Sequence, residues 1–142
     1  MSAAELAEIK AAIGAAEKRT SGEIRVFIED SAEDGPLDRA AFLFNKLGMD
    51  KTNLRNGVLI YVAFVDHKFC IIGDSGINQK VGATFWNAIK EKMIGHFKEN
   101  RIAQGLLEAI VDSGEALAKY FPYAAADRNE LPDDIMFGDG KK

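Results

Sequence analysis

The hydrophobic positions of this chain follow two different spacings. Near the middle, residues 58–65 form an unbroken apolar run that is rich in β-branched and aromatic side chains. In a soluble protein such a run indicates a strand that is covered on both faces. A shorter apolar run at residues 69–72 follows after a brief polar break, so the simplest connection is a hairpin. We therefore predict a central strand at residues 57–65 and an antiparallel strand at residues 68–73.

A third strand is predicted at residues 23–30. Here apolar aliphatic residues alternate with charged and aromatic ones, which is the pattern of a half-covered strand. Pro36 then opens a helical pattern that continues to Leu47 and is followed by Gly48 as a C-terminal cap. Because a helix separates this strand from the one at residues 57–65, we expect the two strands to be parallel, with a right-handed crossover.

The remaining periodic segments predict helices. Ser2 and Glu5 form a capping box that opens a helix at the N-terminus. After the hairpin, apolar residues at spacings of four predict a helix that Asn78 caps and that continues to about Glu99. A fourth helix is predicted at residues 102–121, because the apolar periodicity there is ended by a proline.

Together these elements predict an α/β fold, a three-layer α/β/α sandwich with a mixed central sheet. We assign residues 1–126 to this one domain, since 142 residues suffice for a single hydrophobic core. Residues 127–142 form an acidic tail. Leu131, Ile135 and Phe137 give this tail apolar surface, so we expect it to lie partly against the body of the domain.

Composition narrows the classes of function. The net charge of −4 and the lack of a basic patch argue against a nucleic-acid partner. The single cysteine, Cys70, excludes a disulfide framework and favours a reducing compartment. The N-terminus lacks the pattern of a signal peptide, and no apolar stretch approaches the ~18 residues of a membrane span. We therefore expect a cytoplasmic monomer that does not associate with membranes.

Chain topology brings three polar positions to one edge of the predicted sheet. The strands that begin at Glu23 and after Asn56 and the antiparallel strand that ends at Asp74 meet there. Carboxylate, amide and carbonyl oxygens are the ligands of hard cations, so we predict a calcium or magnesium site at this edge. The next residues along the chain complete the predicted ligand set: Ser75, Gly76 and Asn78.

A second interpretation of the same residues is purely structural. In it, Asp74 and Asn78 cap the following helix and Glu23 is solvated. Carboxylates gathered at one edge also repel one another unless a cation or a basic residue neutralises them. Arg25 and Arg55 are the candidates for a basic partner.

Other polar groups are weaker candidates. Asp30, Asp66 and His67 meet at the opposite edge of the sheet, where ordinary turn chemistry explains them. His96 falls within a helical pattern, and one cysteine with two distant histidines cannot form a familiar zinc site. In the tail, Asp133 and Asp134 are secondary candidates for a metal ligand.

Several segments along the chain form a distinctive set: RNGVLIYVAFVDHKFCIIGDSGI at 55–77, Thr-Ser-Gly-Glu before the first strand, FW at 85–86, GLLEAI at 105–110, FP at 121–122 and NELPDDIMFG at 129–138. Together these segments resemble the TPM-domain family. Their order and spacing cover nearly the whole chain and are similar to a short, stand-alone bacterial subgroup. The absence of a signal peptide or anchor distinguishes this sequence from relatives in the thylakoid lumen or the cell envelope.

The resemblance implies a three-layer α/β/α domain that binds divalent cations, and acid phosphatase activity is attributed to lumenal members. Other relatives are linked to photosystem repair or receptor assembly, so the fold alone does not decide the activity. Three functions follow as hypotheses. The first is a divalent-metal-binding interaction or quality-control module with a protein partner and no catalysis. The second is a metal-dependent phosphatase in which Asp74 or Glu23 acts as ligand or base. The third is a protein scaffold without metal.

Overall fold

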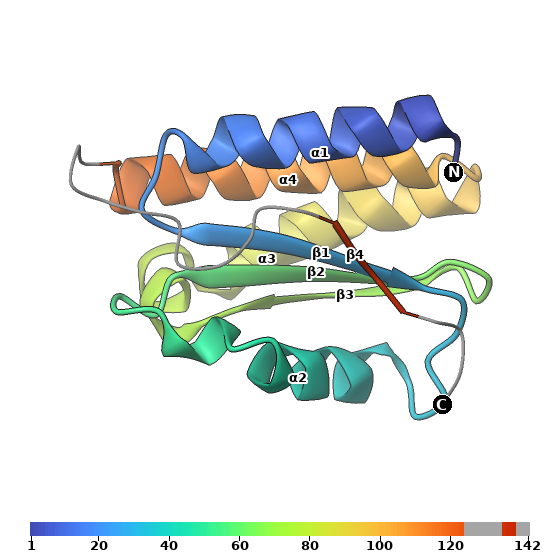
Figure 1. The fold of residues 1–142 in the computed structure, drawn as a ribbon, viewed down its shortest axis with the longest axis horizontal. Coiled ribbons are helices and arrows are strands. Elements are labelled where there is room, and N and C mark those ends of the chain that lie inside the picture. The colour runs from blue at the N-terminus through green and yellow to red at the C-terminus, as the bar shows by residue number, and fades with distance from the viewer. Residues whose placement is uncertain (124–134, 139–142) are drawn as a thin grey trace.

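The computed structural model describes residues 1–123 and 135–138. A four-stranded sheet in the order β3-β2-β1-β4 forms its centre (Figure 1). The elements, in chain order, are α1 Ala3–Glu17, β1 Glu23–Glu29, α2 Pro36–Lys46, the 3₁₀-helix η1 Met49–Lys51, β2 Gly57–Ala63, β3 Lys68–Gly73, α3 Ser75–Lys98, α4 Ile102–Tyr120 and β4 Ile135–Phe137.

The sheet is mixed, as the connectivity predicts. β1 and β2 are parallel with Glu23 opposite Gly57, and β2 and β3 are antiparallel with Val58 opposite Gly73. All seven residues of β2 are buried, so the prediction of a central strand covered on both faces is confirmed. The strand is two residues shorter than predicted, because the hairpin uses four residues and leaves Val65 65% exposed.

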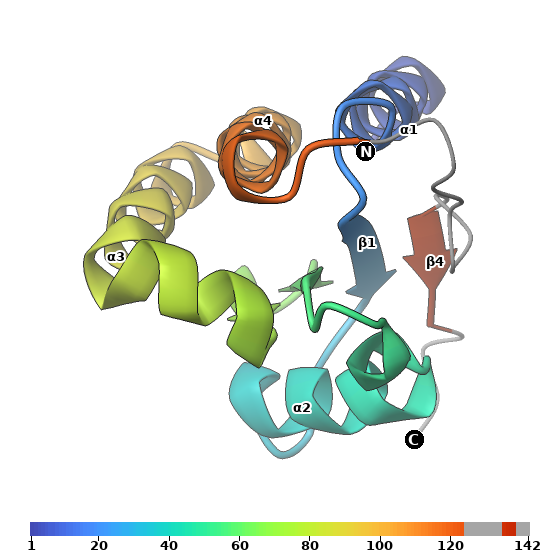
Figure 2. The same cartoon turned by 90° about the vertical axis from the view of Figure 1, so that its left-hand side faces the viewer.

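Helices cover both faces of the sheet (Figure 2). On one face α1, α3 and α4 pack against a cluster that includes Ile24, Val58 and Ile60, and on the other α2 and η1 pack against Leu59 and Tyr61. Strand residues alternate between these two clusters, as the period of two requires. The predicted three-layer α/β/α sandwich with a mixed sheet is therefore confirmed.

The prediction that β1 is half-covered is wrong, because all seven of its residues are buried. Hydrogen bonds from other elements compensate the buried charge of Glu29 at its end. Two nitrogens of Arg39 on α2 donate to the Glu29 carboxylate at 2.7 and 3.0 Å, and the Tyr61 hydroxyl donates to it at 2.5 Å. Buried charges of this kind require such compensation, which the alternating pattern alone does not reveal.

Of two predicted helix N-termini, one is confirmed and one is wrong. The predicted capping box is confirmed, since the Ser2 hydroxyl accepts from the Glu5 backbone and Glu5 accepts from the Ser2 backbone. The prediction that Asn78 caps the third helix is wrong, because Asp74 is the N-cap and α3 begins at Ser75. Within α3 the backbone of Gly82 is non-helical at φ 74° and ψ 175°, a conformation open almost only to glycine.

Part of the tail adds a strand to the sheet. Ile135–Phe137 forms β4, which pairs in parallel with β1 in the register Val26 opposite Ile135. Ile135 is buried, so this short segment lies against the body of the domain. Leu131, Asp133 and Asp134 lie outside the described residues. Within the described part of the chain, no helix has the length and apolar character needed to cross a membrane.

Candidate functional site

The backbone brings the three predicted segments to one edge of the sheet, which we call the Asp74 edge. The amide of Glu23 donates to the carbonyl of Asn56 at 3.3 Å, and the amide of Asp74 donates to the carbonyl of Gly57 at 2.9 Å. These bonds join the starts of β1 and β2 to the end of β3. The convergence expected from topology is thus present in the structure.

Asp74 has a basic partner at this edge. Two nitrogens of the Arg55 guanidinium donate to its carboxylate at 2.7 and 2.8 Å, and the amide of Ser75 donates to it at 2.7 Å. The Asp74 side chain is 6% exposed, whereas that of Arg55 is 51% exposed. The backbone of Arg55 is left-handed at φ 52°, which is uncommon for a residue with a side chain. Asp74 is therefore fixed as a helix cap, while the arginine reaches it from the surface.

Glu23 lies in a different electrostatic environment. It is buried rather than solvated, and so are its neighbours Arg25 and Glu17. Burial lowers the pKa of Arg25, while the charges of Glu23 and Glu17 oppose that shift. The two candidate basic partners thus lie with different carboxylates: Arg25 is near Glu23 and Glu17, and Arg55 is bound to Asp74.

The other predicted ligands have separate roles at the same edge. Asn78 donates to the carbonyl of Gly73 at 2.6 Å and accepts from the indole of Trp86 at 2.8 Å, so its amide group is engaged. The amide of Gly76 donates to the carbonyl of Arg55 at 2.8 Å. The side-chain amide of Asn56 donates to Ser21 at 3.4 Å. Ser75 is exposed on the first turn of α3.

Sequence reasoning missed Asp50, which lies in η1 before the loop that carries Arg55. Its Oδ1 is buried and has no hydrogen-bond partner among the described residues. Hydrogen bonding to Asp74 raises the pKa of Arg55, and the charge of Asp50 adds to this effect. Two carboxylates therefore share one half-exposed arginine. A carboxylate seven residues before β2 was the available signal, but the distance along the chain gave no reason to place it near Asp74.

The opposite edge of the sheet contains turn chemistry. The Asp66 carboxylate accepts from the Ser31 hydroxyl at 3.1 Å and from the Ala32 amide at 3.3 Å. His67 has a left-handed backbone at φ 55° within the hairpin. His96 lies elsewhere, in contact with Glu108 at 3.0 Å between α3 and α4. Across residues 1–123 and 135–138, no three His, Cys, Asp or Glu side chains are grouped as ligands of one metal ion.

The hydroxyl of Tyr61 gives a test of the polar network at this opposite edge. Burial, followed by the hydrogen bond to Glu29, raises the pKa of Tyr61 above its ordinary value of 10. Because the unfolded chain ionises first, this contribution to stability is complete below pH 10 and is lost as the pH rises further. We expect the free energy of unfolding to fall by up to ~1.4 kcal/mol per pH unit in that range.

Urea unfolding between pH 9 and pH 11.5 measures this loss. Tyr61→Phe should remove the decline that this hydroxyl causes, while Tyr120→Phe, which alters an exposed ring, should leave it in place. An equally steep decline in the wild type and in Tyr61→Phe would show that another group is responsible.

The chain has similar sequences and structures among known proteins. A family model described as the TPM domain matches residues 1–116. The chain belongs to the TPM-domain family. This TPM domain is similar to the NMR structure of the BA42 protein from the psychrophilic bacterium Bizionia argentinensis, with 47% identity and a TM-score of 0.89 over 97% of this chain and 95% of that one.

A second solved structure has the same fold at low identity. The N-terminal domain of the cg2496 protein from Corynebacterium glutamicum is 15% identical with a TM-score of 0.58, over 100% of this chain and 84% of that one. A comparison with curated proteins gave no match. The resemblance to the TPM-domain family is thus confirmed. The similar BA42 protein is a stand-alone bacterial protein of nearly the same length.

Proposed function

We propose that this TPM domain binds a calcium or magnesium ion at the Asp74 edge and acts as an interaction or quality-control module without catalysis. The observation that carries the proposal is the buried Oδ1 of Asp50, which has no hydrogen-bond partner in the described part of the chain. It lies close enough to Arg55 to raise the pKa of that residue together with Asp74. The charges of Asp74 and Asp50 therefore both act on this one arginine.

The donor atoms at the edge suit a hard cation. Asp50 and Asp74 offer carboxylate oxygens, Ser75 offers a hydroxyl, and the loop before β2 offers backbone carbonyls. Calcium accepts all of these ligands together with water, so a site does not require three carboxylates. Asn78 and Gly76, which are already engaged, and Glu23, which lies beside Arg25, contribute to the shape and charge of the edge in this proposal.

Binding would proceed by exchange of the cation for Arg55. Because the arginine side chain is about half exposed, solvent screens its ion pair with Asp74. Asp74 itself does not have to move, since it remains the cap of α3. A divalent ion therefore has only a weak competitor for a preformed carboxylate.

The chemistry of the remaining groups supports a module without catalysis. Burial raises the pKa of the Cys70 thiol, which makes the thiolate less available. His67 and His96 are both remote from the Asp74 edge, on the hairpin and between α3 and α4. An interaction module needs neither a nucleophile nor a base, whereas catalysis by these groups would require them to lie together.

Metal-dependent phosphatase activity is the second candidate, and Arg55 favours it. A guanidinium offers two parallel donors that match a phosphate group as well as a carboxylate. Once released from Asp74, Arg55 would be available to hold the phosphoryl oxygens of a phosphomonoester. Turnover of para-nitrophenyl phosphate that requires added metal and is lost in Asp74→Asn would select this function over the first.

Thermal unfolding at increasing calcium or magnesium concentration tests the cation site. We expect the melting temperature to rise with free metal as mass action requires. Arg55→Gln should bind the ion about fivefold more tightly because it removes the competing charge. Asp74→Asn, which retains a good capping residue, and Asp50→Asn should each lose the rise.

Arg19→Gln is the matched control, because Arg19 is an exposed arginine at the end of α1. It should behave as the wild type does. Full metal stabilisation in Asp74→Asn, or loss of binding in Arg55→Gln, would place the site elsewhere. If no variant responds to either ion, the third hypothesis, a scaffold without metal, is favoured.

A further inference from the structure

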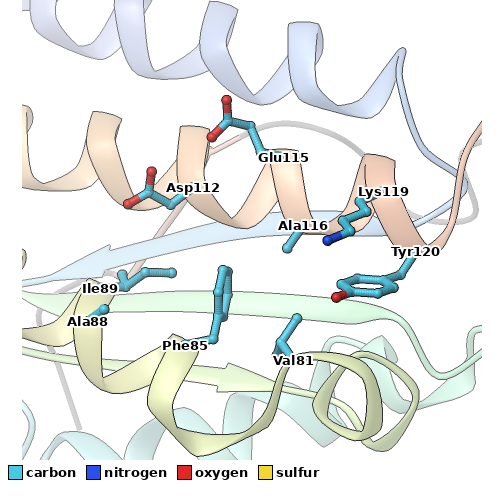
Figure 3. Close-up of a pocket in the computed structure, with 9 residues that line it drawn as sticks. All are labelled: Val81, Phe85, Ala88, Ile89, Asp112, Glu115, Ala116, Lys119 and Tyr120. Atoms are coloured by element: carbon cyan, nitrogen blue, oxygen red, sulfur yellow. The ribbon is translucent and has the colours of Figure 1, made fainter.

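An apolar groove lies between α3 and α4, on the side of the sheet that α1, α3 and α4 cover (Figure 3). Its cavity volume is about 340 Å³, which is within the range of sites for small organic molecules. The apolar lining comes from both helices: Val81, Phe85, Ala88 and Ile89 on α3, and Ala116 on α4. This groove is separate from the Asp74 edge and plays no part in the proposed cation site.

Two exposed polar groups lie at one end of the groove. Figure 3 shows the Lys119 ammonium and the Tyr120 hydroxyl turned toward the space above Phe85 and Val81. Lys119 lies 5.2 Å from the centre of the Tyr120 ring, and among the described residues it has no ion pair. The Tyr120 hydroxyl likewise has no hydrogen-bond partner in that part of the chain. Both groups are donors, and they lie next to each other in sequence and in space.

The acidic residues of the groove do not compete for this end. Asp112 is paired with Lys92 at 2.9 Å, and Figure 3 shows the carboxylates of Asp112 and Glu115 directed away from Lys119. Although Glu115 is one helical turn before Lys119, the two side chains form no ion pair. The positive charge of Lys119 therefore faces the apolar space without an internal counter-ion.

We propose that this groove binds a small monocarboxylate with an apolar or aromatic body. The carboxylate would accept from the Lys119 ammonium and the Tyr120 hydroxyl, and the body would pack on Phe85 between Val81 and Ala116. If each non-hydrogen atom of a ligand needs no more than the ~30 Å³ that one water molecule occupies in the liquid, the groove holds a molecule of about ten such atoms. The break of α3 at Gly82, directly after Val81, shapes the end of the groove where the carboxylate binds.

Titration with 4-phenylbutyrate, followed by amide chemical shifts in NMR spectra, tests the proposal. We expect saturable shifts at the groove residues of α3 and α4, and much weaker shifts with 4-phenylbutylamine, which has the same body and the opposite charge. Lys119→Met should weaken phenylbutyrate binding about fivefold, since an exposed ion pair contributes at this level. Tyr120→Phe should weaken it less, and Lys119→Arg should retain it.

Lys98→Met is the matched control, because Lys98 is an exposed lysine at the end of α3 and does not line the groove. It should bind phenylbutyrate as the wild type does. Three results would overturn the proposal: equal shifts with the amine, which indicate an unspecific apolar surface; unchanged affinity in Lys119→Met; or the absence of shifts at the groove. None of these outcomes depends on calcium or magnesium, so they are independent of the cation site.

Discussion

Replacing Gly76 with alanine is expected to destabilise the domain by about 3 kcal/mol, the upper end of the usual cost of overpacking. A Cβ atom at this position would lie 2.0 Å from the carbonyl oxygen of Leu54 and 2.6 Å from that of Arg55. Both are backbone atoms of the loop before β2, so no side-chain rotation can relieve the contact. The first turn of α3 and this loop would have to separate, which also weakens the bond from the Gly76 amide to Arg55.

Gly95→Ala provides the matched control within the same helix. Apart from the adjacent backbone of its own helix, no described atom lies within 4 Å of a Cβ built at Gly95, and alanine is the better helix former by up to ~1 kcal/mol. Urea unfolding should therefore show a loss of stability for Gly76→Ala and a gain for Gly95→Ala. Similar urea midpoints for the two variants would mean that the loop before β2 moves aside at little cost in stability, and that the backbone at the Asp74 edge is not rigid.

Replacing Arg39 with methionine is expected to cost about 3 kcal/mol of stability. Arg39 makes two hydrogen bonds to the buried Glu29 carboxylate and lies over the ring of Phe27 at 5.9 Å. Its removal leaves a negative charge in the interior with less compensation, which is the costly way to break a buried pair. We place the effect at the lower end of the usual range because the arginine side chain is 29% exposed.

A double-mutant cycle with Glu29→Gln separates the pair from its surroundings. Because Glu29→Gln removes the charge that Arg39 compensates, the double variant should lose less stability than the sum of the two single variants. Lys92→Met, which breaks the more exposed pair with Asp112, should cost much less stability than Arg39→Met in the same urea experiment. Additive losses in the cycle would contradict a direct interaction between Glu29 and Arg39.

Connectivity made most of the fold predictable. The apolar run before the hairpin needs burial on both faces, which the middle of a sheet provides. The helix between the first two strands requires these strands to be parallel. Once the strand directions were known, the meeting of Glu23, Asn56 and Asp74 at one edge followed. These inferences depend on the order of elements, which the sequence contains in full.

Contacts between loops were not predictable in the same way. Asp74 and Asn78 are both good capping residues, and only the exact end of β3 decides between them. The left-handed backbone of Arg55 and the close approach of Gly76 to the loop depend on each other, and neither leaves a local pattern. The burial of the second face of β1 was not predicted for a related reason. Charged residues such as Arg25 and Glu29 normally indicate a solvent-exposed face, and the groups on other elements that surround them cannot be known from the local sequence.

The position of Trp86 makes the first turns of α3 accessible to optical measurement. It is the single tryptophan of the chain, and its indole donates to Asn78, which in turn donates to the carbonyl of Gly73, the residue before Asp74. Its ring meets that of Phe85 edge to face at a centroid distance of 5.0 Å, and Phe85 lines the groove between α3 and α4. The intrinsic fluorescence of the protein therefore originates mainly from one indole that lies between the Asp74 edge and the groove. The chain thus contains its own label-free reporter for rearrangements at either location.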